Sequence, residues 1–135
     1  MKRTMTLLLI LLTLLLAACQ SSGPSNKINV EMTDFAFTPN HFTVPAGEEI
    51  MVNISHHGSV VHEFIIMKAG VDVGKTFDEE DKPNTYSFIE VPPGHSQSFT
   101  FTAPTEPGDY QIVCGIAGHV ESGMTANLTV AQRNS

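Results

Sequence analysis

The chain has 135 residues, of which 41% are hydrophobic and 16% charged, and this length and composition are typical of one globular domain. Its formal net charge of −7 repels phosphate backbones and anionic lipids and favours partners with basic surfaces, so it gives no support to binding of DNA or RNA. The sequence shows no internal repeat and no sign of a second domain.

The first 18 residues have the pattern of an export signal, with a charged head (residues 1–3) followed by an apolar run and small residues. The apolar run, residues 5–18, is 14 residues long and measures about 21 Å as a helix, whereas a membrane span needs roughly 20 residues. The ending Leu-Ala-Ala-Cys resembles the lipobox of bacterial lipoproteins. That resemblance implies cleavage before Cys19 and acylation of its thiol; the alternative is a plain secretory signal in which Cys19 has no role.

Cleavage before Cys19 would leave 117 residues with five basic and 14 acidic side chains, a net charge of −9. Residues 19–27 would then hold the acylated cysteine and a flexible tether that contains Ser, Gly and Pro, and residues 28–135 would form the domain. The lipid anchor would place the protein in the cell envelope, on the extracytoplasmic side of a membrane. In this oxidising compartment Cys114 would be a lone thiol that needs protection, which a metal ion can give.

Apolar and polar residues alternate through most of the domain, and this period of two is typical of half-buried β-strands. Segments rich in Pro and Gly interrupt the alternation at short intervals, as in β-sandwiches. The sequence therefore predicts an all-β fold, a Greek-key β-sandwich of about eight antiparallel strands. The expected strands are residues 28–36, 41–45, 48–55, 60–67, 84–91, 96–102, 108–114 and 124–131.

The stretch from Lys68 to Asn84 fits no strand, because it is charged and contains glycine. We expect a long loop there, with one helical turn. Its acidic run, residues 78–81, is expected to be a solvated face, and docking of a basic partner is the alternative.

The segment from Cys114 to Met124, CGIAGHVESGM, carries a thiol, an imidazole and a thioether at intervals of five residues. These groups are soft to borderline metal donors, and a trigonal His₂Cys set with a weak axial Met is the pattern of an electron-transfer copper site. The second imidazole has to come from another segment. His62 is the best candidate, because it interrupts the apolar strand SVVHEFIIM, where an unpaired imidazole is costly to bury. The expected ligands of one type 1 copper ion are His62, Cys114, His119 and Met124.

The stretch GDYQIVCGIAGHVESGM resembles the C-terminal ligand loop of the cupredoxins, with a tyrosine four residues before the cysteine and the spacing C-x4-H-x4-M. That spacing is similar to the auracyanins and the periplasmic copper-tolerance cupredoxins. The resemblance covers residues 28–131 and implies an electron port at the ring edge of His119, within an apolar patch that includes Ile116. One departure is Glu63, which stands where cupredoxins commonly have an asparagine that ties the two ligand loops together. A carboxylate at this position would change the hydrogen bonds around the site and shift its potential.

Other chemistries fit these residues less well. A nucleophilic Cys–His pair needs a thiolate that a substrate can reach, whereas Cys114 is expected in the middle of the sandwich. Structural zinc takes sets rich in Cys or His, and the stretch HEF lacks the second histidine of the HExxH motif. His56 and His57 fall in the turn before the ligand strand and are expected to be exposed; a surface metal or partner contact is the alternative.

These residues predict an electron carrier and not an enzyme. The expected protein is monomeric and exchanges single electrons with membrane-associated redox partners, such as c-type cytochromes, membrane oxidases or reaction-centre complexes. A copper-handling or copper-tolerance protein would use the same ligands and is the alternative. A third reading, an inert sandwich, predicts no copper binding at all.

Overall fold

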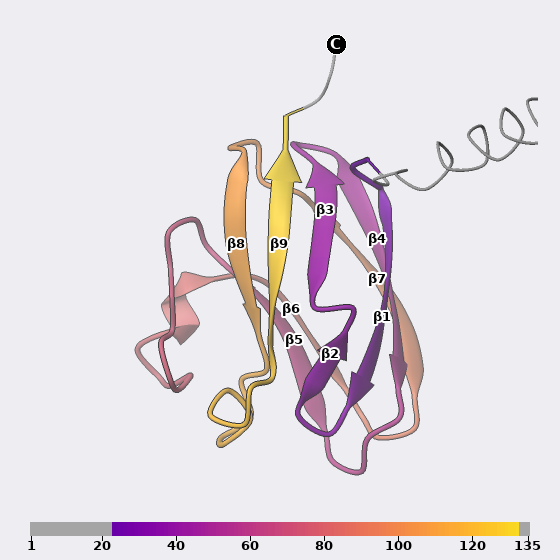
Figure 1. Ribbon diagram of the computed structural model, residues 1–135, viewed down its shortest axis with the longest axis vertical. Coiled ribbons are helices and arrows are strands. Elements are labelled where there is room, and N and C mark those ends of the chain that lie inside the picture. Colours follow the sequence, from indigo (N-terminus) through magenta and orange to yellow (C-terminus); the bar gives the residue numbers. More distant parts are fainter. Residues whose placement is uncertain (1–22, 133–135) are drawn as a thin grey trace, which may run out of the picture.

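The computed structural model describes residues 23–132 (Figure 1). The expected export signal, residues 1–18, and the expected acylation site, Cys19, lie outside the described residues. Within the described part, nine strands form two sheets packed face to face, so the prediction of an all-β sandwich is confirmed. None of the helical segments in residues 23–132 is long and apolar enough to cross a membrane.

The strands follow the expected ranges closely, with one division. The first expected strand, residues 28–36, is broken by a turn at Asp34 and Phe35, where Phe35 has a positive φ of 68°. The elements are β1 (Lys27–Thr33), β2 (Ala36–Thr38), β3 (His41–Pro45), β4 (Glu49–His56), β5 (His62–Met67), η2 (Lys82–Asn84), β6 (Thr85–Val91), β7 (Ser96–Thr102), β8 (Gly108–Val113) and β9 (Thr125–Ala131).

One sheet has the strand order β2-β1-β4-β7, and the other has the order β3-β9-β8-β5-β6. The expectation of purely antiparallel strands is wrong for two neighbouring pairs, because β1 pairs with β4 and β3 pairs with β9 in parallel. The chain leaves the first sheet after β2, forms β3 in the second sheet and returns as β4. Such a crossover between layers lets β1 and β4 run in the same direction.

The core lies between the two sheets and is built by the alternation seen in the sequence. In β1, for example, every second residue is buried, and the same holds for β9. Phe64 is fully buried at the centre, where its ring lies 5.5 Å from Phe37, 6.2 Å from Phe42 and 6.3 Å from Phe99 in edge-on contacts. These rings come from four strands and connect both sheets.

Strand β5 departs from the alternation, because its last four residues are all buried. The long loop between β5 and η2 covers the outer face of the sheet here, and its Val73 and Phe77 pack against a small apolar cluster that includes Ile65 and Met67. A strand covered on both faces has a continuous apolar sequence, as β5 does. The expected helical turn of this loop is the 3-10 helix η2.

The described end of the expected tether is already tied to the sheets. The N–H of Ser25 donates to the carbonyl of Thr43, and the carbonyl of Asn26 accepts a hydrogen bond from the N–H of Met51. Strand β1 begins at the next residue, Lys27.

Several connections lie at one end of the sandwich, away from the described C-terminal end (Figure 1). They include the β1–β2 turn, the β4–β5 turn and the loop between β8 and β9. Side chains from segments that are far apart in the sequence can therefore converge at this end.

Candidate metal centre

Cys114 follows directly after β8 and lies beside the start of β5. The two strands are antiparallel neighbours, with Ile65 of β5 opposite Val113 of β8. This register brings the sulfur of Cys114 to the backbone of Glu63, whose N–H donates a hydrogen bond to Sγ at 3.4 Å. The position of the thiol is therefore set by the sheet itself.

The loop from Cys114 to Met124 is held in shape by its own backbone. The N–H of Cys114 donates to the carbonyl of Met124 at 3.2 Å, and the N–H of Met124 donates to the carbonyl of His119 at 2.9 Å. Gly118 and Gly123 supply the positive φ angles of 85° and 94° that these tight turns require. The three residues that the spacing singled out are thereby joined through the main chain.

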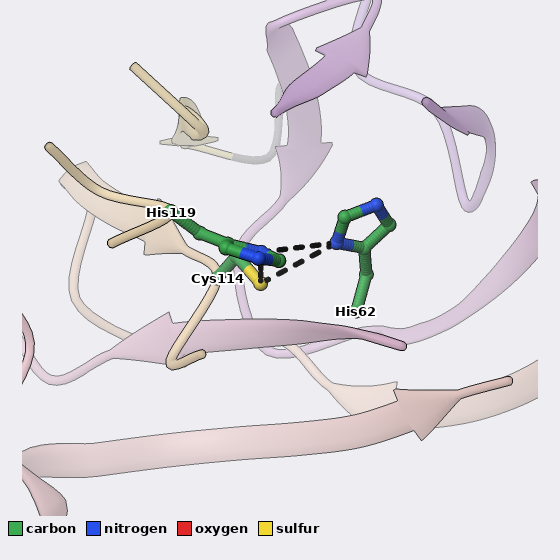
Figure 2. Close-up of side chains that lie close together, drawn as sticks. All are labelled: His62, Cys114 and His119. Atoms are coloured by element: carbon green, nitrogen blue, oxygen red, sulfur yellow. Dashed lines mark hydrogen bonds between the residues drawn. The ribbon is translucent and has the colours of Figure 1, made fainter. Parts of the chain in front are cut away.

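The predicted ligands His62, Cys114 and His119 lie together (Figure 2). Nδ1 of His119 is 3.2 Å from Sγ of Cys114, Nδ1 of His62 is 3.9 Å from the same sulfur, and the two Nδ1 atoms are 3.1 Å apart. The donor atoms of the three residues all lie within 4.8 Å of one another. Two nitrogens and one sulfur thus converge on one point.

This cluster is in the interior. The side chains of His62, Cys114 and Met124 are fully buried, and only 6% of His119 is exposed. The two backbone hydrogen bonds of the loop hold Met124 next to Cys114 and His119. The role of its thioether as an axial ligand remains a prediction.

Burial decides the protonation of the three groups. It raises the pKa of the Cys114 thiol, and it lowers the pKa of His119. The pKa of His62 is lowered by burial first and then by the charges that His56 and His119 carry when protonated. Both imidazoles are therefore neutral at pH 7 and keep a lone pair for a metal, while a buried thiolate needs a cation to compensate its charge.

The donor set fits a copper ion. A thiolate and two imidazoles in a trigonal set are the strong ligands of electron-transfer copper sites, and a thioether is their weak axial ligand. Structural zinc sites use four Cys or His donors, whereas the metal-binding group found in residues 23–132 has three. The chemistry of these residues thus favours copper over zinc.

The expectation for His56 is wrong, although His57 is exposed as expected. His56 is 2% exposed, and its ring stacks on that of His62 with the centroids 4.6 Å apart and the planes at 17°. The alternation of buried and exposed residues could have predicted the burial of His56, because His56 continues the inward-facing series of β4 that includes Val52 and Ile54. The turn begins one residue later than the sequence pattern suggested.

Two further residues near the centre were not singled out in the sequence. Asp34 places Oδ1 3.4 Å from Nε2 of His62, and Phe35 packs edge-on against the ring of His119 with centroids 5.1 Å apart. Both belong to the β1–β2 turn. Neither is a ligand type that the loop motif calls for, so spacing alone could not reveal them.

Glu63 links the two ligand segments by main chain and side chain. Its N–H donates a hydrogen bond to Sγ of Cys114, and its carboxyl group lies so close to Gly115 that a Cβ at residue 115 would collide with it. Burial, and then the charge of Glu90, raises the pKa of the Glu63 carboxyl. Glu63 therefore makes a connection of the kind expected of the asparagine that cupredoxins commonly have at this position.

The fold and the cluster define a small β-sandwich protein with a buried Cys-His₂ metal centre at one end. Comparison with known proteins agrees: the model of the cupredoxin-like domain family matches residues 6–130. The chain belongs to the cupredoxin family.

Individual relatives are similar at moderate identity. Plastocyanin of Mercurialis perennis is 34% identical over 100 residues, which cover 72% of this chain and 89% of the plastocyanin. Sulfocyanin of Sulfolobus acidocaldarius is 27% identical over 124 residues, 85% of this chain and 61% of the sulfocyanin. The copper-resistant cuproprotein CopI of Pseudomonas aeruginosa is 24% identical over 148 residues, 82% of this chain and 79% of CopI.

Solved structures show the same fold. The dithionite-reduced auracyanin of Roseiflexus castenholzii superposes with a TM-score of 0.71 at 32% identity, covering 81% of this chain and 99% of that one. Auracyanin A of Chloroflexus aurantiacus, described as a blue copper protein, has a TM-score of 0.61 at 22% identity over 78% of this chain and 99% of that one. With the family and the donor set together, the cofactor of this chain is one type 1 copper ion.

Proposed function

We propose that the protein is a one-electron carrier whose copper ion is held by His62, Cys114 and His119, with Met124 as the weak axial ligand. Bound copper supplies a one-electron step between its +1 and +2 states. The observation that carries the proposal is the convergence of two Nδ1 atoms and one Sγ within 4.8 Å in the interior of a cupredoxin fold.

The burial of the sulfur supports electron exchange over catalysis. Cys114 has no exposed surface, so no substrate can reach the thiolate for covalent chemistry. An electron, in contrast, can pass through a ligand ring that approaches the surface. The protein therefore exchanges electrons without transforming a substrate.

His119 is the ligand through which electrons enter and leave. It is the ligand with some exposure, 6%, and its ring is flanked by Phe35, which is 43% exposed. Ile116, three residues earlier, is half-buried and packs against the core. We assign Phe35 and Ile116 to an apolar docking patch beside His119, where a partner would exclude water.

The partners are redox proteins with basic surfaces, such as c-type cytochromes or membrane oxidase and reaction-centre complexes. The formal net charge of −7 supports this choice, because it attracts positively charged partners over distance. The protein acts as a monomer in the cell envelope, on the extracytoplasmic side, where the acylated Cys19 anchors it to a membrane. The lipobox-like sequence supports the anchor.

Copper handling is the second candidate. The similarity to the copper-resistant cuproprotein CopI supports it, although at a lower identity than the similarity to plastocyanin. A copper-handling protein would use the same ligands, and its copper would not need to exchange electrons rapidly with a partner.

Stopped-flow mixing of the copper-loaded protein with a basic c-type cytochrome distinguishes the two candidates. An electron carrier should reduce or oxidise the cytochrome rapidly, and the rate should fall steeply as salt is added, because salt screens the attraction between the partners. Slow exchange at every salt concentration, together with copper sensitivity of cells that lack the protein, would favour copper handling and contradict the proposal.

A further inference from the structure

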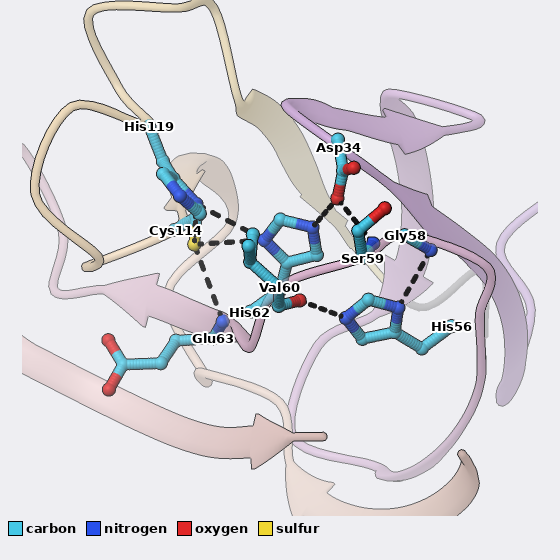
Figure 3. A network of polar contacts seen from close by, with 9 residues as sticks. All are labelled: Asp34, His56, Gly58, Ser59, Val60, His62, Glu63, Cys114 and His119. Carbon is cyan, nitrogen blue, oxygen red and sulfur yellow. Dashed lines mark hydrogen bonds and ion pairs between the residues drawn. The ribbon is translucent and has the colours of Figure 1, made fainter. Parts of the chain in front are cut away.

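The β1–β2 turn touches both ligand imidazoles through consecutive residues. Asp34 faces the ring of His62, and Phe35 packs against the ring of His119 (Figure 3 shows Asp34 with both histidines). Phe35 has a φ of 68°, which is uncommon for an aromatic residue and energetically unfavourable. Surrounding contacts must enforce such a conformation, and strain of this kind is found mostly at functional sites.

Nε2 of His62 is buried, and no atom of residues 23–132 forms a well-aligned hydrogen bond with it. The carboxylate of Asp34, with Oδ1 at 3.4 Å, is the acceptor that faces it. A buried N–H that lacks an acceptor is costly, so a negatively charged oxygen at this position favours a proton on Nε2. Nδ1 of the same ring then keeps its lone pair and points toward Cys114 and His119.

Asp34 is itself fixed in place. The same Oδ1 accepts a hydrogen bond of 2.8 Å from the N–H of Ser59 in the β4–β5 turn. Gly58 packs so closely against Asp34 that an added Cβ would collide with Oδ1. The carboxylate therefore connects the β1–β2 turn, the β4–β5 turn and the ligand ring.

His56 restrains the same ring from another side. Its ring stacks on that of His62, and its two nitrogens are committed, because Nδ1 accepts from the N–H of Gly58 at 3.0 Å and Nε2 donates to the carbonyl of Val60 at 2.8 Å. The plane of His62 is thus set by stacking, while the direction of its two nitrogens is set by Asp34.

We propose that Asp34 is a positioning residue of the copper centre, which holds His62 in the Nε2–H tautomer and presents Nδ1 to the metal. This inference rests on the proposed ligand role of His62. A carboxylate on the outer nitrogen also makes the imidazole a stronger donor, which stabilises the more highly charged Cu(II) over Cu(I). Asp34 thereby strengthens Cu(II) binding and lowers the reduction potential.

The test compares Asp34→Asn with Asp109→Asn. Both variants change the net charge by the same amount, and both native carboxylates accept hydrogen bonds at exposed positions, but Asp109 lies on β8 five residues before Cys114. In Asp34→Asn the amide oxygen can still accept from Ser59 and from Nε2 of His62 but carries no charge, whereas Asp34→Ala removes the acceptor altogether. Nitrogen-15 NMR of the metal-free proteins reads the tautomer of His62, and competition titrations with Cu(II) read the affinity.

Wild-type protein and Asp109→Asn should both show the Nε2–H tautomer at His62. Asp34→Asn should show a Cu(II) affinity lower by roughly 10- to 100-fold and a higher reduction potential, and Asp34→Ala, which lacks the acceptor, should also show a mixture of tautomers at His62. A wild-type His62 with its proton on Nδ1, or an Asp34→Asn variant that matches Asp109→Asn in affinity and potential, would overturn the inference. If the wild-type protein bound no copper through Cys114, the proposed function itself would fail, whatever the tautomer.

Discussion

The backbone N–H of Glu63 donates a hydrogen bond to Sγ of Cys114 over 3.4 Å, and this contact joins the start of β5 to the residue that follows β8. The side chain of Glu63 continues the connection to Gly115. The first ligand segment and the second are therefore held together next to the metal centre by direct contacts of Glu63.

Gly115→Ala tests this connection. A Cβ at residue 115 would collide with Oε2 of Glu63 and with Cδ1 of Ile65, so these two packed side chains have to move. We expect a loss of roughly 1–3 kcal/mol in the free energy of unfolding, as is typical of overpacking, together with weaker copper binding. Urea denaturation and Cu(II) titration measure the two effects. Gly23→Ala is the control, because a Cβ there meets no atom within 4 Å; equal stability of the two variants would contradict the account.

Met124→Leu tests the axial ligand. A buried leucine of similar volume preserves packing, and the three strong ligands remain, so copper binding should persist. The reduction potential should rise, because the lone pair of the thioether stabilises the more highly charged Cu(II) more than Cu(I). Met67→Leu, at another fully buried methionine, should leave the potential unchanged in voltammetry. Loss of all copper in Met124→Leu would show that the thioether is not a weak axial ligand.

The pH dependence of stability tests the cross-strand contact of Asp109. Hydrogen bonds from Thr129 and then from Asn127 hold the pKa of the Asp109 carboxyl below its ordinary value of 3.8. The folded state therefore gains stability from the ionised group above that value and loses it as the pH falls through the lowered pKa. Between about pH 5 and about pH 2, wild-type protein should lose more unfolding free energy than Asp109→Asn. Parallel losses in the two proteins during urea denaturation would refute this contribution.

Phe64→Ala tests the core that supports the site. The ring of Phe64 is fully buried and contacts aromatic rings from both sheets, so its removal leaves a cavity and should cost roughly 3–5 kcal/mol of unfolding free energy. Phe88, on the edge strand β6, is 56% exposed, and Phe88→Ala should cost less than about 1 kcal/mol. Thermal and urea denaturation compare the two, and a similar cost for both would place the core elsewhere.

The ligand loop was predictable because its information is local. Cys114, His119 and Met124 lie on one short loop, and their residue types and spacing can be recognised without knowing how the rest of the chain folds. His62 was predictable for a different reason, since it is a polar residue within an apolar strand. The structure brings His62 to Cys114 and His119 through the pairing of β5 with β8.

The surroundings of the ligands were not predictable in the same way. Asp34 lies 28 residues before His62 in the sequence and reaches it only because two turns meet at one end of the sandwich. The parallel pairs β1–β4 and β3–β9 depend on a crossover between sheets, which strand periodicity does not reveal. Contacts of this kind are set by topology and not by local pattern.

The most direct test of the copper centre is a Cu(II) titration of the metal-free protein, followed by visible absorption and EPR, in wild type and in Cys114→Ser. A thiolate bound to copper in this centre should give an intense visible absorption band in the wild-type protein, and the band should be absent from Cys114→Ser. A colourless wild-type complex, or identical spectra for both proteins, would contradict the assignment of Cys114 as a copper ligand.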